Sequence, residues 1–180
     1  ASIYMPNWDG EYAKELIKLF EVDVNKKINK LSKGMLSMVT IIVALASKAE
    51  YTFLDEPVAG LDVVMREYFY KVLLEEFTES GRTFVVSTHI IEEAADIFEE
   101  VIILDKGQIV LKQNTQDLLD SCRHVSGKAE EVDSMTAGMK VLHEEKLGRS
   151  KGVTVMLEPE KKLYNTPEVA VQPVSLQQVF

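Results

Sequence analysis

Two short apolar runs, each ending in a group of polar residues, constrain the fold of this chain more than any other feature. Residues 51–54 lead directly into Asp-Glu-Pro, and residues 83–86 lead directly into Ser-Thr-His. Short apolar runs bounded by turn residues are typical of buried strands. A helical segment lies between them, with Asp62 as its cap, an end near Ser80 and Gly81 just beyond. A strand, a helix and a strand in this order predict a parallel pair joined by a crossover helix.

Further helices and strands extend this pattern on both sides. Apolar residues at helical spacing, a nearly all-apolar stretch and a tight Asp-Lys-Gly turn mark them. The segments are helices over 11–20 (after the N-cap residue Asp9), 35–46 and 90–98, and strands over 101–104 and 108–111. The fold class predicted for this part is therefore α/β, with a mainly parallel sheet and crossover helices.

The pattern becomes less regular after residue 112. A helix begins within 115–119, a strand covers 153–157, and an amphipathic helix starts at 175. We therefore predict a small α/β accessory region over residues 113–180.

The first polar group carries two adjacent carboxylates, Asp55 and Glu56, at the end of a strand. In open α/β sheets, ligands bind beyond the carboxyl ends of the strands. Nucleotide hydrolysis uses two acids in this position for different tasks: one holds Mg²⁺, usually through water, and the other orients or deprotonates the attacking water. Taken alone, the pair is equally typical of an acidic turn after a buried strand, so both interpretations stand at this point.

Two other groups have comparable chemistry. Ser32, Lys33 and Gly34 precede the apolar helix, and a Ser and a Gly at a helix start make an anion site because the first amides are unsatisfied and the dipole is favourable. His89 follows the second strand, where an imidazole could contact a phosphate and position water. The alternatives are a simple helix cap before a core helix and a structural histidine.

The order and spacing of these groups resemble the second half of an ATP-binding-cassette (ABC) ATPase domain. Leu-Ser-Lys-Gly-Met over 31–35 is similar to the family signature Leu-Ser-Gly-Gly-Gln, with Lys33 in place of a glycine and Met35 in place of the glutamine. Ala-Gly-Leu-Asp over 59–62 resembles the D-loop, Ser-Thr-His over 87–89 resembles the switch-histidine segment, and the hairpin after residue 100 resembles the closing strands. The resemblance covers about residues 3–112.

The resemblance implies a fold, a set of site residues and partners. The fold is a partial P-loop NTPase (RecA-like) core, with part of the helical subdomain over 1–48, the C-terminal half of the core over 49–112 and the accessory region over 113–180. The cofactors implied are ATP and Mg²⁺. The residues implied are Glu56 and His89 for catalysis, Asp55 for the metal, and Ser32, Lys33, Gly34 and Asp62 for the nucleotide.

The implied function is that of the ATP-binding subunit of an ABC transporter, which couples ATP hydrolysis to transport. Its partners are a second ATP-binding subunit and a transmembrane permease, and its place is cytoplasmic, peripheral on the inner face of the cell membrane. The pattern is most similar to ATPases of Gram-positive efflux or antibiotic-response transporters.

One essential motif of such an ATPase is missing from these 180 residues. No G-x-x-x-x-G-K-[ST] phosphate loop occurs, and the nearest imitation, 122–129, has Cys122 in place of the first glycine and Ala129 in place of Ser or Thr. The upstream glutamine loop is also missing. We therefore expect a fragment that is inactive alone and binds ATP and Mg²⁺ weakly or not at all. The alternative is a naturally short, non-catalytic regulatory or interaction module.

Composition excludes several other classes. The formal net charge of −9 argues against a nucleic-acid partner, and hence against a soluble ABC-type ATPase acting on DNA or ribosomes. A single cysteine, Cys122, excludes an internal disulfide framework. Cys122, His124 and His143 lack metal-ligand spacing. The longest apolar run, 38–46, is too short to span a bilayer.

Overall fold

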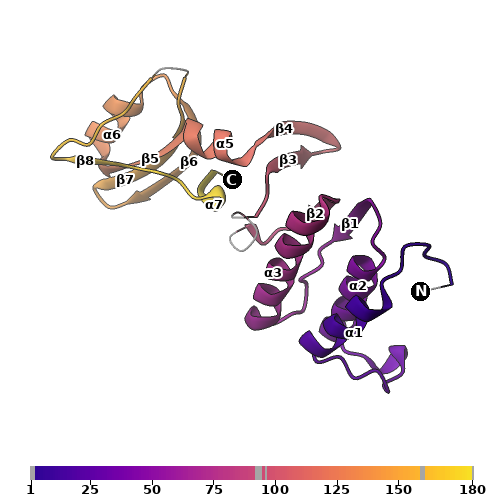
Figure 1. The fold of residues 1–180 in the computed structure, drawn as a ribbon. Coiled ribbons are helices and arrows are strands. Elements are labelled where there is room, and N and C mark those ends of the chain that lie inside the picture. The colour runs from indigo at the N-terminus through magenta and orange to yellow at the C-terminus, as the bar shows by residue number, and fades with distance from the viewer. Residues whose placement is uncertain (1–2, 92–94, 96, 159–160, 180) are drawn as a thin grey trace. The chain divides into compact units, whose positions relative to one another are not determined.

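The computed structural model describes residues 3–91, 95, 97–158 and 161–179 of the chain (Figure 1). The chain divides into two compact units, Ala1–Glu93 and Ala94–Phe180. This division follows contacts within the chain, whereas the division into 1–48, 49–112 and 113–180 follows the resemblance and stays a prediction. We describe each unit by itself.

In its described residues, the first unit contains four helical segments and a pair of strands. Local signals place the helix ends as the sequence predicts: Asp9 accepts from the Tyr12 amide, and Gly81 ends the long helix with a φ of 65°. The elements are α1 (Gly10–Leu19), the 3₁₀ turn η1 (Ile28–Lys30), α2 (Lys33–Ala46), β1 (Tyr51–Asp55), α3 (Val63–Ser80) and β2 (Thr83–Ser87). The predicted helices over 11–20, 35–46 and 62–80 are confirmed.

The two strands of this unit are parallel, and they are aligned so that Tyr51 pairs with Thr83 and Asp55 with Ser87. Both strands therefore end at the same edge, which brings the polar residues that follow them together. One face of the pair contributes Leu54 to a core that the three helices complete. The largest buried side chains of this core include Leu16, Phe20, Ile41, Leu45 and Phe69.

The expectation that both strands are buried holds for alternate residues of β1 and is wrong for the rest of β1 and for β2. Alternate residues of β1 face away from the core, so Tyr51 is 61% exposed and Phe53 74% exposed, and Val85 of β2 is 44% exposed. The physical reason is that this two-stranded sheet has helices on one face only within the described part of the unit, while parallel sheets normally have both faces covered. The apolar runs reflect a face that is uncovered in these residues.

A buried ionic cluster joins three elements of the first unit. Glu76 of α3 is 4% exposed and pairs with Arg82 at 2.7 Å and with Lys48 at 2.8 Å. The Arg82 guanidinium also donates to the backbone carbonyls of Leu45 and Ala49, so it ties the end of α2 to the start of β2. Burial, together with the nearby Glu76 carboxylate, raises the pKa of the Tyr12 phenol far above its usual value.

The second unit begins with the predicted hairpin and continues into a small sheet. The expected helix over 90–98 lies partly outside the described residues, because 92–94 and 96 are not described. The elements are β3 (Glu100–Asp105), β4 (Gln108–Asn114), α5 (Thr115–Ser121), β5 (Cys122–Lys128), α6 (Ala129–Thr136), β6 (Lys140–Leu147), β7 (Ser150–Met156), β8 (Val169–Gln172) and α7 (Leu176–Val179). The predicted hairpin, the helix start at 115, the later strand and the helix near 175 are confirmed.

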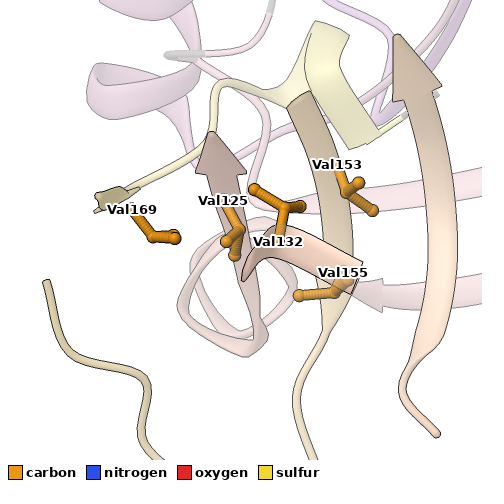
Figure 2. Close-up of a cluster of buried hydrophobic side chains, with 5 residues drawn as sticks. All are labelled: Val125, Val132, Val153, Val155 and Val169. Atoms are coloured by element: carbon orange, nitrogen blue, oxygen red, sulfur yellow. The ribbon is translucent and has the colours of Figure 1, made fainter. Parts of the chain in front are cut away.

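The sheet of this unit has the strand order β6-β7-β5-β8, and every neighbouring pair is antiparallel. Since β7 lies between β5 and β6, those two strands are parallel to each other, and α6 connects them in a split β-α-β arrangement. Val132 of α6 packs against valines of three strands (Figure 2). The cluster consists of Val125, Val132, Val153, Val155 and Val169, all at most 2% exposed.

We expect Val153→Ala to lower the free energy of unfolding of the second unit by about 2 kcal/mol, since it deletes two methyl groups from this core and leaves a cavity. The reactivity of the Cys122 thiol measures this loss of stability, because the side chain is fully buried and reacts only when the unit opens. Burial also raises the pKa of the thiol, which keeps it unreactive in the folded unit. Labelling of Cys122 by a disulfide reagent should become about 30-fold faster. The matched control is Val141→Ala, at an exposed position of β6. Equal labelling rates in the two variants would contradict this view of the core.

Candidate functional site

The candidate site lies at the shared edge where β1 and β2 end. The Asp55 carboxylate accepts a short hydrogen bond from the Ser87 hydroxyl, and the Glu56 amide donates to the Ser87 carbonyl at 2.9 Å. His89 Nδ1 lies 2.8 Å from Oε1 of Glu56. The parallel register therefore brings together three of the residues that the sequence singles out, Asp55, Glu56 and His89, and adds Ser87.

Glu56 is held in an unusual conformation with one oxygen in need of a partner. Its φ is 44°, in the left-handed backbone region that residues other than glycine rarely adopt. Its Oε2 is buried, and no donor among the described residues reaches it. Because buried polar atoms are nearly always hydrogen-bonded, Oε2 marks a place for a donor such as water. His89 is 75% exposed on its side chain, so the pair is open to solvent on that side.

The second group of predicted residues lies at the start of α2. Ser32 caps this helix, its Oγ accepting from the Met35 amide at 3.2 Å. The Ser32 hydroxyl hydrogen is not used in this bond, so it remains able to donate. Ser32 and Lys33 are exposed, and Gly34 is half-buried. The group thus presents a hydroxyl, an ammonium and the first amides of a 14-residue helix, which together suit an anion.

The turn after Glu56 connects the two groups. Asp62 caps α3 by accepting a hydrogen bond from the Met65 amide at 3.0 Å, as the sequence predicts. Gly60 has a φ of 84°, and a Cβ added to Gly34 would overlap the Gly60 carbonyl oxygen. Ser37 of α2 donates to the Ala59 carbonyl at 3.1 Å. Sequence reasoning gave Ser37 no role, because only the folded chain brings positions 37 and 59 together.

The electrostatics of the site are set by a carboxylate pair and a histidine, with one lysine at the other group. In the described residues, no cluster of three or more His, Cys, Asp or Glu side chains is arranged to hold a metal ion. The fit to Mg²⁺ depends instead on Asp55, which is exposed at the strand end beside Ser87. Mg²⁺ suits such a place, since it is usually held by one or two carboxylates together with water and substrate phosphates.

None of the described helices is long and apolar enough to cross a membrane. A pocket of about 450 Å³ lies in the second unit, with Arg123, Leu157 and Tyr164 among its lining residues. Because Asp55, Glu56 and His89 gather at the ends of β1 and β2, and none of the site residues that the sequence predicts lines this pocket, we place the candidate site at the strand ends.

One family profile and several curated relatives match this chain. A family profile described as "AAA domain, putative AbiEii toxin, Type IV TA system" matches residues 18–95. An uncharacterized ABC transporter ATP-binding protein of Nostoc sp. is 34% identical over 63% of this chain and 35% of its own length. Another, from Methanocaldococcus jannaschii, is 35% identical over 65% of this chain and 47% of its own length. The chain thus spans between a third and a half of the length of these curated relatives.

Solved structures agree with this similarity. The dimeric structure of MJ0796, described as a bacterial ABC transporter cassette, is 32% identical, with a TM-score of 0.53, over 59% of this chain and 49% of that chain. A second structure of the same cassette, in a post-hydrolysis state bound to ADP and Pi, matches equally well. The predicted α/β fold of P-loop NTPase type is therefore confirmed.

Proposed function

We propose that this chain, whose homologues are ABC transporter ATP-binding proteins and whose structural neighbours are ABC ATPase cassettes, is the C-terminal part of such a cassette. The observation that carries this proposal is the Glu56–His89 pair at 2.8 Å, beside Asp55, at the shared end of two parallel strands. In the proposed function these residues act on ATP held by a phosphate loop in the preceding part of the same cassette.

Each residue has a distinct task in this proposal. Glu56 orients or deprotonates the attacking water, and its unpartnered Oε2 is the oxygen that suits that role. His89 holds the Glu56 carboxylate through Oε1 and has its other ring nitrogen left for the γ-phosphate. Asp55, fixed by Ser87, holds Mg²⁺ through water. When bound, ATP supplies the phosphoryl group and Mg²⁺ neutralises its developing charge.

The start of α2 serves the other ATP of a dimer. Ser32 donates its free hydroxyl hydrogen, Lys33 its positive charge and Gly34 a close backbone approach to the phosphates bound by the partner subunit. Asp62 uses one carboxylate oxygen to cap α3, which leaves the other for the dimer interface. The dimeric form of the similar MJ0796 cassette supports this assignment.

In the whole protein, closure of two such subunits on ATP and reopening after hydrolysis would drive a membrane permease. The protein would then lie in the cytoplasm on the inner face of the membrane. The alternative, a short regulatory or interaction module without catalysis, is less well supported, because Asp55, Glu56 and His89 form a contiguous polar site that a purely structural module does not need.

We expect the 180-residue chain alone to bind Mg·ATP with a Kd above about 1 mM, since the main phosphate ligands are absent from it. A fluorescent ATP analogue titrated into the chain, and into the longer product of the native gene, measures this difference. The longer protein should bind at least about 100-fold more tightly and hydrolyse ATP. Micromolar binding by the 180 residues would overturn the proposed dependence on a separate phosphate loop. A longer product without ATP hydrolysis would favour the regulatory alternative.

A further inference from the structure

The start of α2 and the turn after Glu56 are in direct contact over several residues. Ser37 Oγ donates to the Ala59 carbonyl at 3.1 Å. Gly34 packs so closely on Gly60 that a Cβ on Gly34 would overlap the Gly60 carbonyl oxygen. The aliphatic stem of Lys33 also lies against Gly60, because its Cγ is about 3.5 Å from where a Cβ on Gly60 would stand. These contacts fix the turn against α2 at a place where Gly60 has a positive φ, a conformation that glycine adopts readily.

From this contact, hydrogen bonds lead to the backbone of Glu56. The Ala59 amide donates to the Glu56 carbonyl at 3.0 Å, so Ala59 is bonded on one side to α2 and on the other to Glu56. The Leu61 amide donates to the Val58 carbonyl at 3.1 Å, and Val58 is fully buried. The Glu56 amide donates to β2, through the Ser87 carbonyl. The rare φ of Glu56 is thus maintained from both sides.

We propose that Ser37 is a positioning residue for Glu56, acting through the Ala59 carbonyl. In the described part of this turn, the Ser37 side chain is the one that donates a hydrogen bond from α2 to the turn's backbone. Loss of this bond frees Ala59, and with it the left-handed conformation that aims the Glu56 carboxylate toward His89. The same contact makes the anion-binding start of α2 and the Glu56 turn one rigid piece. The consequence for hydrolysis rests on the proposed function; the geometric claim does not.

The geometric claim is tested by hydrogen exchange on the 180-residue chain. Ser37→Ala should make the amides of Glu56, Ala59 and Leu61 exchange about fivefold faster, which corresponds to the net loss of one hydrogen bond. The matched control is Thr40→Ala, which removes a hydroxyl that donates within α2, to the Leu36 carbonyl. The control should leave these three amides unchanged, and amides of α3 should be unchanged in both variants. Unchanged exchange in Ser37→Ala, or an equal increase in Thr40→Ala or throughout α3, would overturn the proposal.

The catalytic consequence is tested in the longer protein. Ser37→Ala should lower kcat by about 10- to 100-fold and leave KM within about twofold, because it misplaces Glu56 without touching nucleotide. Thr40→Ala should leave both constants unchanged. A normal kcat in Ser37→Ala, in a protein where Glu56→Gln abolishes turnover, would overturn the positioning role alone. A normal kcat in both Ser37→Ala and Glu56→Gln would overturn the proposed function of Glu56. The exchange result would still decide the geometric claim.

Discussion

Glu56→Gln in the longer protein should lower ATP turnover by about 100- to 10,000-fold while ATP binding stays within about twofold of the unchanged protein. The amide keeps the size of the carboxylate and can still accept a hydrogen bond from His89 at the Oε1 position. It cannot accept a proton from water, and at the buried Oε2 position it places a donor where the carboxylate offers an acceptor. The steady-state rate of phosphate release and the Kd for ATP measure the two effects separately.

The matched control for this substitution is Glu50→Gln. Glu50 is an exposed residue just before the start of β1, at the end opposite to Glu56. Its backbone carbonyl accepts a hydrogen bond from the Thr83 amide. The control should retain full turnover. Turnover by Glu56→Gln equal to that of Glu50→Gln would remove Glu56 from its role as general base.

Glu76→Ala should lower the free energy of unfolding of the first unit by about 3–5 kcal/mol. The substitution leaves Arg82, 8% exposed, and the amino group of Lys48 without their common carboxylate. Removing one partner of a buried ion pair leaves an uncompensated charge in a low-dielectric interior. The free-energy cost of that charge exceeds the modest net stabilisation that the intact pair provides. Since whole domains are stable by about 5–15 kcal/mol, we expect a large fall in the urea midpoint of this unit.

The matched control is Glu75→Ala, at the neighbouring position of α3. Glu75 is exposed, and its Oε1 lies 4.0 Å from Nζ of Lys71. An exposed ion pair of this kind contributes little to the free energy of unfolding. Its loss should change the free energy of unfolding by less than about 0.5 kcal/mol. Similar urea midpoints for the two variants would show that the Glu76 cluster does not stabilise the unit in the way its burial indicates.

The parts of the fold that the sequence predicts best are those with local signals. Asp9, Ser32 and Asp62 each accept from a backbone amide three residues on, and Gly81 ends α3, so these helix ends follow from nearby residues alone. The shared edge for Asp55, Glu56 and His89 also follows from sequence, because two strands joined by one crossover helix run parallel and end together.

The parts that the sequence did not predict depend on distant residues or on weak patterns. β6 carries four charged residues, at 140, 144, 145 and 146, and β5 contains a Ser-Gly pair, so neither has the apolar run expected of a strand. Their pairing partner β7 supplies the buried valines that hold them in the sheet. The contact of Ser37 with Ala59 has no sequence signal at all, since it joins positions 22 residues apart.

The exposed faces of β1 and β2 illustrate a different limit. Phe53 and Val85 are residue types that are typical of buried strands, although both are exposed here. Alternation between core and solvent cannot be recognised in a run of residues where both faces of the strand are apolar. The sequence therefore predicted the strands correctly but not that one face is uncovered in these residues. The roles of Glu56, His89, Asp55 and the Ser32 group stay predictions of the proposed function.

The chemical identity of the nucleotide retained by the Glu56→Gln protein is the most direct test of the central claim. The longer protein carrying this substitution is incubated with Mg²⁺ and γ-labelled ATP, separated rapidly from free nucleotide, and the bound label is analysed. We predict intact ATP, because binding survives while the step that Glu56 assists does not. Bound ADP, formed as fast as in the unchanged protein, would contradict the assignment of hydrolysis to the site at the ends of β1 and β2.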